Sequence, residues 1–198
     1  MAPSGESNGT TIDDAAINTH ELRAALRQCK KTRSSGDDRL TYELLKEVPK
    51  KSHGTILKFF NNIWQRGQLP PDWKKAIVVS VLKPNKSAFE AGSYRPIALT
   101  SVLCKLMERL IANRLRWWME DNNLYSKFQS GFRRRRSCQD HIMRLADEVH
   151  KATNNKQFTL SVMIDLEQAF DLVWHQGLLY NTKQLGLAAT CSSSSRTS

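Results

Sequence analysis

Features that define several common protein classes are absent from this sequence of 198 residues. Its four cysteines form no Cys-x-x-Cys pair, and no histidine stands at a zinc-ligand spacing from two of them. This pattern excludes a zinc finger or a disulfide-rich domain and favours reduced thiols. No apolar run approaches the roughly 20 residues that a membrane-spanning helix needs, and the N-terminal residues lack the basic and apolar regions of a secretory signal. We therefore expect an intracellular protein with no membrane segment, in the nucleus or the cytoplasm.

The positive charge of the chain is concentrated in one region. The net charge is +11, and hydrophobic residues make up 40% of the sequence, which is enough for a buried core. Residues 1–50 carry eight basic and eight acidic side chains, whereas residues 51–136 carry seventeen Lys or Arg against five Asp or Glu, a local net charge of +12. Such a local excess indicates a surface that meets a polyanion. The alternative is a generally basic soluble protein.

Apolar residues at three- and four-residue spacing predict six helices. The predicted helices start near Asn18, cover residues 41–48, start at Thr55, Ser101 and Ser137, and cover residues 178–185. Ser137 and Asp140 resemble a capping box for the helix that follows them. In that helix we expect four side chains to be buried, namely Ile142, Leu145, Ala146 and Val149.

Two β-branched runs predict neighbouring strands. Residues 76–82, AIVVSVL, read as a strand that is buried on both faces. Residues 94–99, YRPIAL, are the candidate return strand, which Pro96 places at an edge or keeps short. If these strands pair as an antiparallel hairpin, Lys83 and Arg95 lie at the same end and can grip a triphosphate. The alternative is a solvated hairpin tip.

A third predicted strand, residues 158–165, ends in a carboxylate. Because side chains alternate along a strand, Phe158, Leu160, Val162 and Ile164 share an apolar face, and Asp165 emerges on the more polar face. A carboxylate held there is a good ligand for Mg²⁺, whose remaining positions phosphate and water can fill, as phosphoryl transfer requires. The alternative is that Asp165 forms a turn or caps a helix. Asp171 reads as an acidic residue in the first turn of the next helix.

A run of four arginines, residues 133–136, follows Phe132 and lies downstream of Tyr125 and Phe128. Aromatic side chains interleaved with cations are typical of nucleic-acid contact. The alternative is a charged loop without a ligand.

Four blocks of the sequence resemble motifs of one enzyme family. IDLEQAFDLVWHQGLL resembles the first catalytic motif of reverse transcriptases from non-LTR, LINE-like retrotransposons, and SYRPIALTSVLCKLMERLIANRL resembles their fingers motif. QSGFRRRRSCQDHI resembles the motif between these two, and SSGDDRLTYELLK resembles, more loosely, the family's first motif. The blocks occur in the family's order and cover the chain from about residue 20 to about residue 187.

The resemblance implies a set of site residues. Asp165 matches the metal-binding aspartate, and the carbonyl of Leu166 would be a further ligand, in a family site that holds two Mg²⁺ (or Mn²⁺) ions. Phe170 matches the bulky residue that rejects a ribose 2′-hydroxyl. Arg95 and Lys83 would hold the incoming deoxynucleoside triphosphate. The segment near the RNA template and the DNA primer would contain Gln129, Gly131, Phe132, Arg133 and Arg134.

The implied fold is of the α+β class: the fingers and partial palm of a right-hand, reverse transcriptase-like polymerase, incomplete. On this reading residues 1–17 are a mobile polar tail and residues 18–157 are the fingers region. Residues 158–187 are then the first part of the palm, and residues 188–198 are a Ser-rich tail. The resemblance leaves the oligomeric state open.

The sequence also departs from the family's pattern. No aromatic-x-Asp-Asp block follows Asp165, so the second carboxylate pair of the family site is missing and the resemblance ends after the first catalytic motif. One aspartate cannot hold two metal ions in line for a displacement. We therefore expect a part of an RNA-templated DNA polymerase that is inactive alone. The alternatives are a non-catalytic nucleic-acid-binding fragment and an inert remnant with an exposed strand edge.

Overall fold

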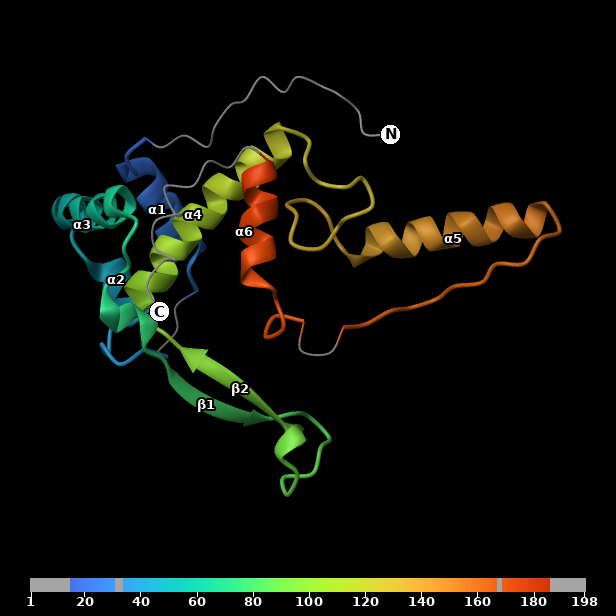
Figure 1. Ribbon diagram of the computed structural model, residues 1–198, viewed down its shortest axis with the longest axis horizontal. Coiled ribbons are helices and arrows are strands. Elements are labelled where there is room, and N and C mark those ends of the chain that lie inside the picture. The colour runs from blue at the N-terminus through green and yellow to red at the C-terminus, as the bar shows by residue number, and fades with distance from the viewer. Residues whose placement is uncertain (1–14, 31–33, 167–168, 186–198) are drawn as a thin grey trace. The chain divides into compact units, whose positions relative to one another are not determined.

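The computed structural model describes residues 15–30, 34–166 and 169–185, which fall into two compact units (Figure 1). The first unit ends at residue 114 and the second begins at residue 115, so that helix α4 (Val102–Asp121) contributes to both. The predicted Ser-rich tail and most of the predicted N-terminal tail lie outside the described residues. Among the described helices, none is both long and apolar enough to cross a membrane.

The first unit is built mainly from helices, as the hydrophobic periodicity predicts. Its α-helices are α1 (Thr19–Gln28), α2 (Tyr42–Glu47), α3 (His53–Arg66) and the first part of α4. Short 3₁₀ turns are η1 (Lys50–Ser52), η2 (Pro71–Lys74) and η3 (Ala91–Ser93). Local sequence signals set the helix ends: Asn18 and Glu21 form a capping box at the start of α1, and Gly67 takes the left-handed conformation (φ 64°) after α3.

The apolar faces of three helices meet in the core of this unit. Phe60 of α3 and Leu22 of α1 are fully buried, as is Leu106 of α4. Trp73 of η2 packs edge-on against Phe60, with ring centroids 6.2 Å apart. Burial of these large apolar side chains supplies most of the favourable free energy of folding. The core therefore fixes the helices from which the strands extend.

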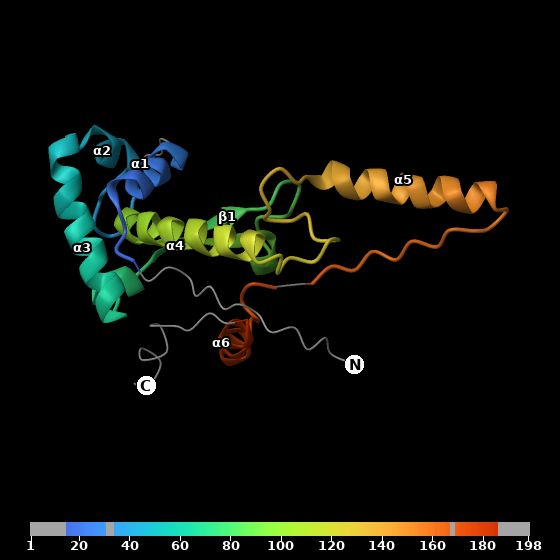
Figure 2. The same cartoon turned by 90° about the horizontal axis from the view of Figure 1, so that it is seen from above.

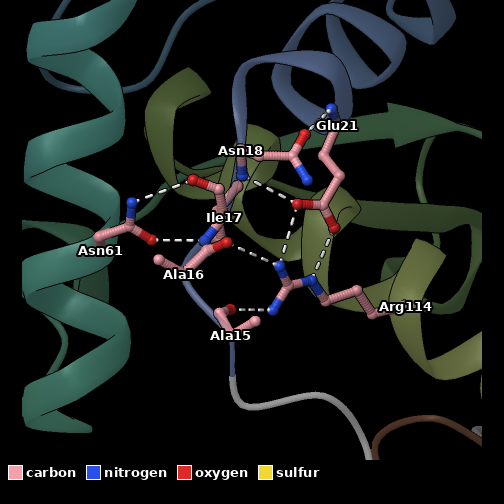
Figure 3. Close-up of polar contacts among 7 residues, drawn as sticks. All are labelled: Ala15, Ala16, Ile17, Asn18, Glu21, Asn61 and Arg114. Atoms are coloured by element: carbon pink, nitrogen blue, oxygen red, sulfur yellow. Dashed lines mark hydrogen bonds and ion pairs between the residues drawn. The ribbon is translucent and has the colours of Figure 1, made fainter.

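A polar cluster fastens the start of the described chain to the helices (Figure 3). The Arg114 guanidinium donates to both carboxylate oxygens of Glu21, at 2.7 and 2.9 Å, and to the carbonyls of Ala15 and Ala16, at 2.6 and 3.3 Å. The Asn61 side chain exchanges two hydrogen bonds with the backbone of Ile17, which is buried. Within the predicted tail of residues 1–17, residues 15–17 thus have backbone partners on α3 and α4.

Strands β1 (Ile77–Leu82) and β2 (Tyr94–Leu99) form an antiparallel hairpin that projects from the helices of the first unit (Figure 1). The predicted pairing is confirmed, and Pro96 is accommodated because each strand of a two-stranded sheet is an edge. The predicted burial of the first strand on both faces is wrong: all six residues of β1 are exposed. Its apolar composition indicates a preference for burial, but no described element covers either face of the hairpin.

The second unit contains the end of α4, helix α5 (Cys138–Asn154) and helix α6 (His175–Gln184). Asp140 accepts a hydrogen bond from the Ser137 backbone N–H at 2.7 Å, which confirms the predicted capping interaction at the start of α5. The chain turns back after α5 and continues as an extended segment (Figures 1 and 2). The predicted burial of one α5 face is wrong, because Ile142 is 64% exposed and α5 has no buried residue.

The predicted strand over residues 158–165 is also wrong. These residues are extended but form no ladder, and their apolar side chains are exposed, with Phe158 and Leu160 almost fully so. A strand requires hydrogen-bonding partners on a neighbouring strand. In the described part of the chain, the only strands are β1 and β2, and they pair with each other.

Candidate nucleotide and nucleic-acid site

The hairpin brings Lys83 and Arg95 together. Val81 stands opposite Arg95, and the Lys83 N–H donates to the Ser93 carbonyl at 2.8 Å, so the ladder continues for one further residue. Opposed residues share a face of the sheet, as do residues two apart on one strand. Lys83 and Arg95 are therefore diagonal neighbours on one face, at the end of the hairpin that carries the loop.

The loop between these two cations is ordered by its own hydrogen bonds. The Lys83 ammonium donates to the Gly92 carbonyl at 2.8 Å, and the Tyr94 hydroxyl donates to the Ala88 carbonyl at 3.0 Å. An ammonium has three donors, so Lys83 keeps two for a ligand. Arg95 is exposed, and its planar guanidinium can form a bidentate contact with phosphate oxygens. The geometry at this end suits an anionic ligand.

Asp165 lies in the second unit, on the extended segment rather than on a strand. Its carboxylate is exposed and accepts a hydrogen bond from the Leu166 N–H at 3.0 Å. Phe170, four residues beyond Leu166, is also exposed. Nowhere in the described ranges do three or more His, Cys, Asp or Glu side chains gather as metal ligands. Asp165 therefore offers a single carboxylate to a divalent ion, and the described residues do not gather the further carboxylates that two ions would need.

Arg133 is held tightly by other parts of the second unit. Its guanidinium forms a bidentate pair with Glu120, at the C-terminal end of α4, with N–O distances of 3.0 and 2.7 Å. The Nη1 group donates to the carbonyls of Ser126 and Gln129, at 3.2 and 3.3 Å, and the guanidinium lies 4.7 Å from the Tyr125 ring. The hydrogen bonds from Arg133 hold the pKa of Glu120 below its usual range. These contacts close residues 122–136 into a loop, which we call the arginine loop.

The arginine loop presents its other predicted contact residues to solvent. Phe132 has a left-handed backbone (φ 61°) and is 84% exposed, and Arg134 and Arg135 are exposed beside it. Gly131 and Gln129 are exposed and linked by a weak hydrogen bond of 3.5 Å. Of the five residues predicted to lie near the template, Arg133 alone is mostly enclosed, with 12% of its side chain exposed, and Ser130 between them is buried.

Phe128 marks a second exposed aromatic position in the arginine loop. Its ring is 63% exposed and lies 5.0 Å from the Lys127 ammonium and 5.5 Å from the Arg144 guanidinium. Arg144 also donates to the Lys127 carbonyl at 2.7 Å, which ties α5 to the loop. A cation over an aromatic face stabilises both groups.

The loop that resembles the family's first motif packs on the start of α4. A Cβ atom on Gly36 would lie 2.7 Å from the Thr100 carbonyl carbon and 2.8 Å from the Ser101 nitrogen, so this approach requires glycine. Thr100 follows β2 directly, and the contact thereby fixes the junction between the hairpin and α4. The sequence marks the loop, but not the neighbour that makes Gly36 necessary.

Two ion pairs escaped prediction because their partners are distant in the sequence. Glu120 and Arg133 are thirteen residues apart, and Glu21 and Arg114 are separated by 93 residues. No local spacing rule links such pairs. Glu120 is therefore added to the candidate site as the partner that restrains the arginine loop.

Known proteins match this chain over most of its length. A family model described as reverse transcriptase (RNA-dependent DNA polymerase) matches residues 81–195. An RNA-directed DNA polymerase from the mobile element jockey of Drosophila melanogaster is 32% identical over 171 residues, which are 86% of this chain and 19% of the relative. A probable RNA-directed DNA polymerase from the transposon BS of the same species is 36% identical over 169 residues, 85% of this chain and 19% of the relative. The chain thus spans about a fifth of the length of these curated relatives.

Proposed function

Because this chain belongs to the reverse transcriptase (RNA-dependent DNA polymerase) family, we propose that it supplies the triphosphate-holding hairpin and the first metal-binding aspartate of an RNA-templated DNA polymerase. Its similarity to polymerases from jockey and related elements supports an origin in a non-LTR retrotransposon. In this proposal residues 18–157 form the fingers region and residues 158–187 form the first part of the palm. An intracellular location, in the nucleus or the cytoplasm, is part of the proposal.

The observation that carries this proposal is the arrangement of Lys83 and Arg95 on one face of the hairpin, within the part of the chain that the family model matches. Arg95 would bind two phosphate oxygens with its planar fork, and Lys83 would add a point charge. Together they would neutralise part of the charge of an incoming deoxynucleoside triphosphate. Phe170 would exclude a ribose 2′-hydroxyl by its bulk.

Asp165 and the carbonyl of Leu166 would hold a Mg²⁺ or Mn²⁺ ion. When bound, the ion supplies charge neutralisation at the phosphate oxygens that react. The exposed carboxylate leaves its second oxygen and the surrounding solvent positions open for such an ion. The second ion of the family site needs further carboxylates, and we therefore propose that this chain alone binds substrates without polymerising them.

The first prediction concerns binding of a deoxynucleoside triphosphate to the hairpin. Titration of the full chain with a fluorescent dNTP in Mg²⁺ should give binding that Arg95→Gln weakens by about tenfold, because a charge-assisted bidentate contact is lost. Lys58→Gln is the matched control: it removes the same charge from an exposed position on α3 and should leave the affinity unchanged. An equal loss of dNTP affinity in both variants would indicate that the hairpin contributes only general positive charge and no specific contact.

Primer extension on an RNA template completes this test. We expect no extension by the chain alone, whatever the divalent ion, because the family's second carboxylate pair is missing from the sequence. Extension above background that disappears in Asp165→Asn would contradict this expectation and show that one carboxylate suffices.

A non-catalytic role in binding nucleic acid is the second candidate function. The arginine loop favours it, because the partners Glu120 and Ser126 that hold the loop belong to the second unit and the loop carries exposed cations. Binding of an RNA–DNA duplex without any binding of a dNTP would favour this candidate over the first.

A further inference from the structure

We propose that Arg133 is a positioning residue which, through Glu120, orders the arginine loop, and that Phe132, Arg134 and Arg135 contact a single strand of RNA. The inference rests on the proposed function, since it names the nucleic acid that the arginine loop binds and the residues that position or contact it. It divides the four consecutive arginines into one that holds the loop and others that face the ligand.

Arg133 has few donors left for a phosphate. A guanidinium carries five N–H donors, and four hydrogen bonds to Glu120, Ser126 and Gln129 engage all three of its nitrogens. The Tyr125 ring lies 4.7 Å from the guanidinium. One N–H remains, and a nucleic acid could engage more of this side chain only by breaking bonds that include the bidentate pair with Glu120, which is among the stronger side-chain contacts.

The same bonds connect separate parts of the loop. Glu120 lies on α4, whereas Ser126 and Gln129 lie within the arginine loop, and Arg133 reaches all three. Removal of this link would loosen the part of the loop around Ser126 and Gln129, whereas residues 122–124 keep their backbone hydrogen bonds to the end of α4. A loop that is already ordered loses less conformational entropy when it binds a ligand, so the link should strengthen binding without touching the ligand.

The exposed side of the loop fits an unpaired base between phosphates. Phe132 adopts a positive φ that is unfavourable for a residue other than glycine, asparagine or aspartate, and its ring is directed to solvent rather than into a core. Exposed aromatic rings stack on single-stranded bases, and neighbouring arginines contact the backbone. Arg134 and Arg135 follow Arg133 directly and are exposed, as is Arg136 after them.

The competing explanation is that Arg133 contacts phosphate itself and only rests on Glu120 in the free protein. The Glu120→Gln substitution distinguishes the two explanations, because one predicts a higher affinity for RNA and the other a lower one. If Arg133 is a phosphate contact, the loss of a nearby negative charge frees it, and affinity rises. If Arg133 positions the loop, the weaker pair loosens the loop, and affinity falls although the chain becomes more positive.

The experiment measures binding of the full chain to a fluorescein-labelled oligouridine of about 16 nucleotides across a salt series. We expect Glu120→Gln and Arg133→Gln each to weaken binding by about fivefold, with the slope of log affinity against log salt unchanged. Arg135→Gln should reduce that slope by about one. Phe132→Ala should weaken binding by about tenfold without changing the slope of log affinity against log salt. Asp121→Asn, at the neighbouring exposed carboxylate, is the matched control and should bind slightly more tightly.

A second readout reports the order of the loop itself. Trypsin should cleave at residues 134–136 faster in Glu120→Gln than in the wild type or Asp121→Asn, because a restrained loop resists the extended conformation that proteases bind. Circular dichroism of each variant confirms that the helices are retained.

Each outcome has a definite meaning. Tighter binding by Glu120→Gln, or a reduced salt slope in Arg133→Gln, overturns the positioning role while the proposed function stands. Failure of the wild-type chain to bind either oligouridine or an RNA–DNA duplex overturns the proposed function together with the RNA contact. A preference for the duplex that Phe132→Ala does not change overturns the single-strand contact alone.

Discussion

Individual cations in this chain have different roles, which their contacts distinguish. Arg114 is 13% exposed and Arg133 is 12% exposed, and each forms a bidentate pair with a glutamate and further bonds to backbone carbonyls. Arg95, Arg134 and Arg135 are exposed. The total of 30 Lys and Arg side chains therefore overstates the number of cations that are free to bind an anion, because each of these pairs is neutral.

The pair of Glu21 and Arg114 makes stability depend on pH. Burial alone would raise the pKa of Glu21, but hydrogen bonds from Arg114 and from the Asn18 backbone outweigh it and hold the pKa below its ordinary value of 4.5. A carboxylate whose pKa is lowered by folding stabilises the native state above the unfolded pKa. This contribution is lost as the pH falls from about 4.5 through the lower folded value.

Glu21→Gln should therefore lower the free energy of unfolding at neutral pH by about 1–2 kcal/mol and flatten its decline below pH 4.5. Urea unfolding of the wild type and the variant between neutral and acid pH measures both effects. Glu47→Gln, at an exposed position of α2, is the control and should leave the curve unchanged. If the free energy of unfolding declines equally with falling pH in the wild type and in Glu21→Gln, other carboxylates are responsible for the acid sensitivity.

Among the elements, the hairpin and α4 depend on a close contact with the loop that precedes α2. The backbone of Thr100 and Ser101 passes so near to Gly36 that no side chain fits between them. This contact fixes the junction between β2 and α4, and thus supports the end of the hairpin that is attached to the core.

Gly36→Ala should destabilise the chain by about 1–3 kcal/mol, because its Cβ would lie 2.7 Å from a backbone carbon that cannot rotate away. Gly54→Ala is the matched control within α3, since no atom lies within 4 Å of its added Cβ and alanine favours helices. Thermal unfolding of both variants tests the difference. An equal melting temperature for Gly36→Ala and the wild type would contradict the close contact.

At the scale of the whole molecule, the two units differ in how much they bury. The first contains a contiguous core to which α1, α3 and α4 contribute. In the second, α5 has no buried residue and the extended residues 158–166 are exposed throughout. Elements with few buried apolar contacts open at low free energy.

Hydrogen exchange should therefore separate the units. Amides in the middle of α1, α3 and the first part of α4 should be protected to the level of global unfolding, whereas those of α5 and residues 158–166 should exchange orders of magnitude faster. Mass spectrometry of the full chain after labelling resolves these segments. Equal protection of α5 and α3 would indicate that the exposed face of α5 is covered in solution.

The elements whose signals are local could be predicted from the amino-acid sequence. Periodic apolar residues and capping groups located the helices, and two β-branched runs around a loop gave the hairpin with Lys83 and Arg95 at one end. The family's motifs could also be recognised in the sequence, because each motif is a contiguous stretch. These features need only neighbouring residues and the geometry of one helix or one hairpin.

Which apolar faces are covered and which charges are paired depends instead on contacts between distant parts of the folded chain. The predicted burial of β1 and α5, and the predicted strand at residues 158–165, failed because an apolar pattern records a preference for burial but not the presence of a partner. The pairs formed by Arg114 and Arg133 join residues far apart in the sequence. Their existence depends on how the chain folds back on itself, which no local pattern specifies.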